Sequence, residues 1–205
     1  MRKVEVVSHK KVWSKLFQNE CKRLQDIFGH EMMNLYHIGS TAIPVIHAKP
    51  VIDILAAVKD VECVADFNKE MERIGYDARG ENGIAGRRFF LKGGDERTHH
   101  IHMFQKGHAE ISRHLAFRDY MLAHPYEAQK YSQLKQHLAA EFPDDIKGYV
   151  NGKNDFIKVV DERAKQWAAS LNEKGDHHVN EVDQMPHYGT MNIHINGTWI
   201  RNCLP

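Results

Sequence analysis

The sequence has few cysteines, and this shortage excludes two kinds of protein. Only three, Cys21, Cys63 and Cys203, occur in 205 residues. Their odd number and wide spacing argue against a disulfide framework and against a cysteine metal site. Reduced thiols of this kind are typical of a cytosolic protein.

Net charge and long apolar runs are also lacking. The 28 Lys and Arg residues against 27 Asp and Glu give a net charge of +1, so no overall field selects nucleic acid or an acidic membrane. The N-terminus MRKVEVVSHKKVW has no apolar segment typical of a signal peptide, and no run approaches the roughly 18 apolar residues that span a bilayer. We expect a cytoplasmic protein that binds neither a membrane nor a specific nucleic acid.

The pattern that is present predicts an α+β domain with a small mixed sheet and flanking helices. Amphipathic spacing predicts helices over residues 11–28, 61–76, 113–124, 127–142 and 153–171. Apolar runs and turn signals predict strands over residues 34–38, 50–58, 87–92 and 99–104. We assign one domain to residues 1–171, with the sheet core in about 1–110 and a helical segment in about 111–171.

A polar tail follows the domain and covers residues 172–205. Within it, residues 190–200 alternate well enough to predict a late strand. That strand could dock on a sheet edge, exchange with a neighbouring chain or stay mobile. A homodimer is therefore left open.

The stretch YHIGSTAIPVIHAKPVIDILAAV holds the main candidate site. Gly39, Ser40 and Thr41 end one predicted strand in a turn whose backbone N–H groups can hold phosphate oxygens, although the P-loop spacing is absent. Asp53 lies in the next apolar strand, where a carboxylate needs a partner. Either a divalent cation facing bound phosphates or a neighbouring group such as Lys49 could supply it.

Two histidines and two arginines extend this candidate site. His100 and His102 alternate in HHIHMF and share a strand face. They could join Asp53 around a metal or donate to a phosphate, and His102 could act as an acid or base near neutral pH; a solvated strand face is the alternative. Of Arg87 and Arg88, one could reach a phosphate, or both could keep a sheet edge soluble.

Two further residues are expected near the turn. Lys49 lies between the turn and Asp53, and could balance either the carboxylate or a substrate phosphate. His37 directly precedes the end of the first strand, and we expect it to line the same pocket.

The segment HIGSTAIP…AKPVIDILAAV resembles the signature of the GrpB family, and more broadly the nucleotidyltransferase superfamily. VWSKLFQNE, GRRFF, HHIHMF, HLAFRDYMLAHP, YSQLK and YVNGKNDFI agree with the family in order, so the resemblance covers roughly Val4 to Trp167. The resemblance implies a nucleotidyltransferase-like fold in which Gly39 and Ser40 hold phosphates and Asp53 holds a metal.

The sequence departs from the superfamily pattern at the acidic residues. Leu55 stands where a second acid is expected, and the later strand offers His100 and His102 in place of a third. The resemblance implies nucleotide binding with Mg²⁺ or Mn²⁺, or Zn²⁺ through the histidines, and nucleotidyl transfer with Asp53 and His102 as catalytic residues. Non-catalytic binding of a nucleotide or phosphometabolite, and a folding or assembly role, remain as alternatives.

Overall fold

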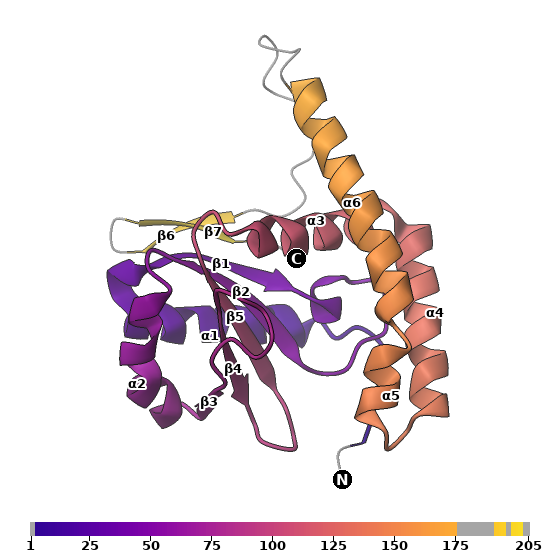
Figure 1. Ribbon diagram of the computed structural model, residues 1–205, viewed down its shortest axis with the longest axis horizontal. Coiled ribbons are helices and arrows are strands. Elements are labelled where there is room, and N and C mark those ends of the chain that lie inside the picture. The colour runs from indigo at the N-terminus through magenta and orange to yellow at the C-terminus, as the bar shows by residue number, and fades with distance from the viewer. Residues whose placement is uncertain (1–2, 176–190, 196–197, 203–205) are drawn as a thin grey trace.

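A five-stranded mixed sheet forms the centre of the computed structural model, which describes residues 3–175, 191–195 and 198–202 (Figure 1). Its strand order is β1-β2-β5-β4-β3. β2 and β5 are parallel, and the other neighbours are antiparallel. The strands are β1 Met32–Ile38, β2 Ile52–Val58, β3 Tyr76–Ala78, β4 Arg87–Lys92 and β5 His99–Gln105. The α+β class and the small mixed sheet expected from the sequence are confirmed.

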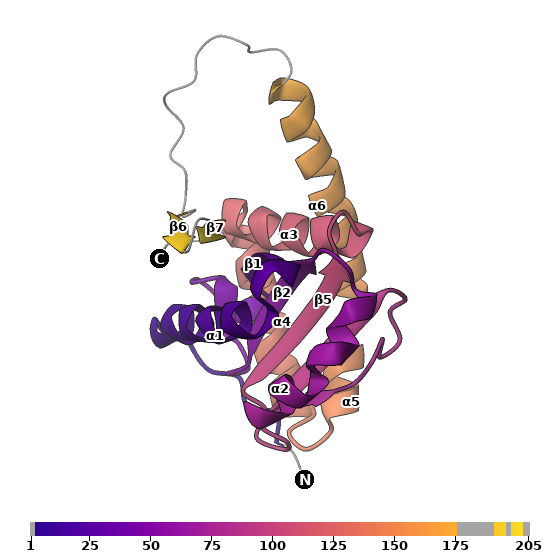
Figure 2. The ribbon, with the colours of Figure 1, turned by 90° about the vertical axis from the view of Figure 1, so that its left-hand side faces the viewer.

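Helices lie on both sides of this sheet (Figures 1 and 2). α1 and α2 pack on one face, whereas α3 packs on the other and joins α4, α5 and α6 in a helical segment. Their bounds are α1 Val12–Phe28, α2 Asn68–Arg73, α3 Ala109–Ala123, α4 Pro125–Glu141, α5 Ile146–Asn151 and α6 Asn154–Gly175. Three short 3-10 turns complete the domain: η1 Gly29–Glu31, η2 Ser40–Ala42 and η3 Glu62–Phe67.

Some predicted elements differ from those observed. The single helix expected over 61–76 is divided into η3 and α2, and α2 ends at Arg73 because Gly75 adopts a φ of +88° and the chain then enters β3. The short helix α5 was not predicted, and Asp145 caps it by accepting hydrogen bonds from two backbone N–H groups. In place of one late strand, β6 (Met191–Ile195) and β7 (Thr198–Asn202) form a hairpin. The tail over 176–190 lies outside the described residues.

Alternate side chains of β2 point to opposite faces of the sheet. Ile52, Ile54, Ala56 and Val58 are fully buried among the side chains of α1 and α2. Leu55 points the other way and packs with Ile38 and Phe104 beneath α3. Asp53 shares that second face but lies at the beginning of the strand, beside the helical segment.

The loop between η2 and β2 joins the sheet to the helical segment. Ile43 and Ile46 leave the sheet and are buried among α3, α4 and α6. The backbone N–H of His47 donates to the Ser132 hydroxyl on α4 at 2.9 Å. The Lys135 ammonium, also on α4, donates to the carbonyl of His47. The position of α4 is thereby tied to the strand that carries Asp53.

None of the helices in the described ranges is long and apolar enough to cross a bilayer. Cys21 and Cys63 are free thiols, and Cys203 lies outside the described residues.

A buried ion pair connects α1 to β4. The Lys92 ammonium lies 2.8 Å from a carboxylate oxygen of Glu20, whose side chain is only 3% exposed. Burial raises the pKa of Glu20, but the hydrogen bond and charge of Lys92 outweigh it and hold that pKa below its ordinary value. The pair therefore fixes α1 against the far half of the sheet.

We expect Lys92→Met to lower the free energy of unfolding by about 3 kcal/mol, because it leaves the buried Glu20 carboxylate with only the largely exposed Arg23, at 3.3 Å, as a counter-ion. Urea denaturation measures this loss. Lys22→Met, on the exposed side of α1, is the matched control and should stay within about 0.5 kcal/mol of the unmodified protein. Equal effects of the two substitutions would show that the ion pair between Lys92 and Glu20 does not stabilise the fold.

Candidate functional site

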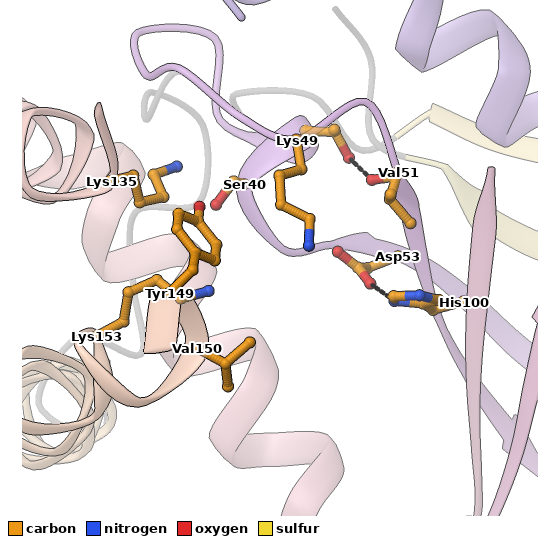
Figure 3. A pocket seen from close by; sticks show the side chains of 10 residues that line it. Ser40, Lys49, Val51, Asp53, His100, Lys135, Tyr149, Val150 and Lys153 are labelled. Atoms are coloured by element: carbon orange, nitrogen blue, oxygen red, sulfur yellow. Dashed lines mark hydrogen bonds and ion pairs between the residues drawn. The ribbon is translucent and has the colours of Figure 1, made fainter. Parts of the chain in front are cut away.

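A cavity of about 220 Å³ lies where the beginning of β2 meets the helical segment (Figure 3). In Figure 3, Asp53 and His100 project from the sheet, and Lys135, Tyr149 and Lys153 project from the helical segment. The lining residues are Ser40, Thr41, Lys49, Val51, Asp53, His100, Lys135, Tyr149, Val150 and Lys153. The cavity thus has walls from both parts of the domain.

Gly39 sets the position of the turn at the edge of this cavity. It follows Ile38, which pairs with Asp53 across the two strands, and its φ is +68°. A Cβ atom at this position would lie 2.4 Å from Oδ2 of Asp53. Only glycine permits both this backbone conformation and this close approach. The predicted pairing of the Gly-Ser turn with the Asp53 strand is therefore present in the structure.

Asp53 has a partner on the neighbouring strand. The Nδ1–H of His100 donates to Oδ1 of Asp53 at 2.9 Å, and the two side chains are 22% and 26% exposed. Burial raises the pKa of Asp53, but the hydrogen bond and charge of His100 prevail and hold that pKa below its ordinary value. Asp53 is therefore a carboxylate at neutral pH, with one oxygen engaged by His100.

We expect Gly39→Ala to destabilise the protein more than Gly80→Ala. Gly80 also has a positive φ, of +55°, but a Cβ there would meet nothing within 4 Å. Gly80→Ala should therefore cost only the strain of the left-handed backbone, about 1–2 kcal/mol. Gly39→Ala should exceed this in urea denaturation because it also displaces Asp53. Equal losses in the two variants would show that the approach of Gly39 to Asp53 imposes no constraint.

Two lysines of the cavity, Lys135 and Lys153, were not among the predicted site residues. Each ammonium lies over an aromatic ring: that of Lys135 is 4.6 Å from the centre of Tyr131, and that of Lys153 is 4.4 Å from the centre of Tyr149. Lys49, which was predicted, lies over Tyr149 at 5.3 Å. Their cationic groups are therefore held at defined positions along the wall.

Burial lowers the pKa values of Lys135 and Lys153. Desolvation, followed by the charge of Lys153, lowers the pKa of Lys135 to about 7. Desolvation also lowers the pKa of Lys153 from its ordinary value, against a smaller opposite effect of Asp53. In the ligand-free protein Lys135 thus changes its charge near neutral pH, and a bound anion would favour its charged form.

The stability of the folded protein should depend on pH through Lys135. Because burial lowers the Lys135 pKa to about 7 from its ordinary 10.5, the unfolded chain binds more protons between these values, and stability rises with pH. The quantity to follow is the difference in unfolding free energy between the unmodified protein and Lys135→Met. We expect this difference to rise from about pH 7 to pH 10.5, by at most about 1.4 kcal/mol per pH unit. Urea denaturation over this range measures the difference, and a pH-independent difference would contradict the assignment.

His37 and Thr41 hold the turn in place. The Thr41 hydroxyl donates to the carbonyl of Val51 at 3.2 Å and accepts from Nε2 of His37 at 3.0 Å. The His37 ring stacks on Phe17 with 4.8 Å between ring centres, and burial lowers its pKa to about 4. Thr41 borders the cavity, but His37 is not among its lining residues. We therefore correct the placement expected for His37.

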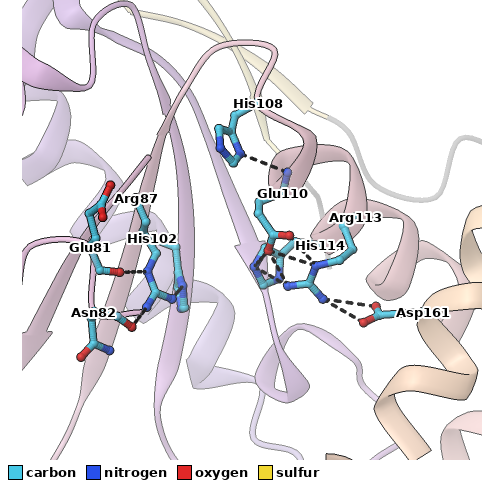
Figure 4. A network of polar contacts seen from close by, with 9 residues as sticks. All are labelled: Glu81, Asn82, Arg87, His102, His108, Glu110, Arg113, His114 and Asp161. Atoms are coloured by element: carbon cyan, nitrogen blue, oxygen red, sulfur yellow. Dashed lines mark hydrogen bonds and ion pairs between the residues drawn. The ribbon is translucent and has the colours of Figure 1, made fainter. Parts of the chain in front are cut away.

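His102 belongs to a different polar network, beneath the beginning of α3 (Figure 4). Its Nδ1 lies 3.3 Å from a guanidinium nitrogen of Arg87, and its ring contacts those of Phe89 and His114. Burial lowers the pKa of His102 to about 3. This environment does not suit the acid–base role near neutral pH expected for His102.

Neither of the two predicted arginines lines the cavity. Arg87 pairs with Phe104, four positions along β5 from His100, which corresponds to roughly 13 Å. Its guanidinium donates to the carbonyls of Glu81 and Asn82. Arg88 points to the opposite face and forms an ion pair with Glu62 at 2.6 Å. The cations at the cavity are lysines instead.

The predicted metal ligands are not gathered around one point. Among the residues that the structure describes, no three His, Cys, Asp or Glu side chains are placed to hold a metal ion. His100 is hydrogen-bonded to Asp53, whereas His102 lies beside Arg87. Leu55, at the position of the second acid, is fully buried against Ile38 and Phe104. The donor set does not fit a two-metal centre.

The fold and the cavity define a mixed α+β protein with a lysine-rich pocket beside a Gly-Ser turn. Residues 3–163 match the sequence profile of the GrpB protein family, and the chain belongs to this family. The crystal structure of GrpB from Enterococcus faecalis is 41% identical, with a TM-score of 0.76, and the match covers 80% of this chain and 99% of that one.

Two further comparisons bear on the extent of the likeness. YqkA of Bacillus subtilis is 48% identical over 171 residues, a match that covers 83% of this chain but spans half the length of YqkA. A structure of the Cid1 poly(U) polymerase aligns at 12% identity over 63% of this chain and 45% of its own, with a TM-score of 0.41.

Proposed function

We propose that this protein binds a phosphorylated small molecule, with nucleotides as the first candidates, in the cavity between β2 and the helical segment. The observation that carries the proposal is the composition of the wall. Lys49, Lys135 and Lys153 line the cavity together with a single carboxylate, Asp53. Several ammonium groups around one space favour a ligand with more than one negative charge.

The surroundings of these charges strengthen the expected interaction. Lys135 and Lys153 are desolvated enough that their pKa values are lowered, so they lose little further hydration when an anion enters. Electrostatic attraction is also stronger away from bulk water. The turn residue Ser40 also lines the cavity, where its hydroxyl could donate to a phosphate oxygen.

The size of the cavity indicates which part of a ligand it would enclose. A volume of about 220 Å³ lies below the roughly 300–1,000 Å³ of pockets that bury most of a drug-sized ligand. The phosphate groups would therefore occupy the enclosed space. The remainder of a nucleotide would extend out of the cavity toward solvent.

Nucleotidyl transfer is the second candidate, favoured by the contact between the Gly39 turn and Asp53. In that reaction an acceptor hydroxyl attacks the α-phosphorus and pyrophosphate leaves. Leu55 in place of a second acid weighs against it, so binding is the function that the site supports best.

Thermal denaturation with ATP, GTP, CTP, UTP or inorganic pyrophosphate tests the proposal, with and without Mg²⁺, Mn²⁺ or Zn²⁺. At a hundredfold excess over Kd, we expect a bound compound to raise the unfolding midpoint by roughly 5–10 °C. Ser40→Ala should weaken binding of that compound about tenfold, because it removes a hydrogen bond to a charged group.

Ser112→Ala on the exposed surface of α3 is the matched control and should bind as the unmodified protein does. Release of pyrophosphate from a bound nucleotide would favour transfer over binding alone. No shift with any of these compounds would contradict the proposal and leave the assembly role as the remaining reading.

A further inference from the structure

The charges of the cavity are arranged in the opposite way from those of a site built around divalent cations. Such a site gathers carboxylates, because hard cations take several oxygen ligands. Here the lining residues include three lysines and one acid. The cations come from three separate places: the loop before β2, α4, and the junction of α5 with α6.

The single acid supplies few oxygen ligands for a cation. Oδ1 of Asp53 accepts the hydrogen bond from His100. Oδ2, beside Gly39, is the other carboxylate oxygen, and a hard cation needs several more oxygen ligands than this. A divalent ion beside Asp53 would also be repelled by the ammonium groups along the same wall.

The ammonium groups, in contrast, are fixed before any ligand arrives. Lys49 and Lys153 both lie over the ring of Tyr149, a side chain that is 1% exposed. Lys135 is 2% exposed and is anchored by the carbonyl of His47 and the ring of Tyr131. Holding flexible side chains in place in advance lowers the entropic cost of binding.

We infer that Lys49, Lys135 and Lys153 neutralise the phosphate charge of the ligand in place of divalent cations, so that binding needs no metal. The inference rests on the proposed function, since it concerns the same cavity. It assigns the site to ligands that enter as metal-free phosphate anions.

Titration calorimetry with ATP and with inorganic pyrophosphate, each in excess EDTA and in excess Mg²⁺, tests the inference. We expect at least one of them to bind in EDTA as tightly as in Mg²⁺. Lys153→Met should weaken binding in EDTA by about tenfold or more, through loss of one charge-assisted contact. Lys158→Met, on the exposed side of α6, should have no effect.

Lys153→Arg tests whether Lys153 acts through its positive charge. It keeps the cation, and we expect it to restore much of the affinity lost in Lys153→Met. Urea denaturation of both variants shows that each is folded.

The possible failures are distinct. Binding that occurs only with Mg²⁺ overturns the inference but leaves the proposed function standing. Equal weakening by Lys153→Met and Lys153→Arg overturns the assigned role of charge. Absence of binding in both buffers overturns the inference together with the proposed function.

Discussion

The close approach of Gly39 to Asp53 is the constraint on which the rest of the site depends. Because no side chain fits between the turn and the carboxylate, β1 ends beside Asp53 and the chain leaves the sheet at that point. The following loop then carries Ile43 and Ile46 into the helical segment. A single position without a Cβ thus determines both the location of the carboxylate and the attachment of the second wall.

The two walls differ in chemistry as well as in origin. The sheet contributes Asp53 and His100. These two side chains are hydrogen-bonded to each other, and the bond links β2 to β5. The helical segment contributes Lys135 and Lys153, whose ammonium groups rest on aromatic rings. The acid on the sheet is therefore engaged within the protein, and the positive charge of the helical side faces the shared space.

Local patterns were sufficient to predict the four longer strands of the sheet, its longer helices and one wall of the site. The Gly-Ser turn and Asp53 are close in sequence, and alternation correctly placed His100 and His102 on one face. Alternation does not show how far a residue lies along a strand, so it could not separate His100 at the cavity from His102 in the network beneath α3. Lys135 and Lys153 resemble the other lysines of the predicted amphipathic helices, and only the packing of α4 and of the α5–α6 junction brings them to the cavity that Asp53 lines.

The span of the contacts around the cavity has a consequence for how the chain folds. Asp53 and His100 are 47 residues apart, and His47 and Lys135 are 88 residues apart. Contacts of such long sequence separation require large loops to close, and they form slowly compared with helices and hairpins. The cavity is therefore completed late on the folding pathway, after the hairpin of β4 and β5 and the individual helices can already have formed.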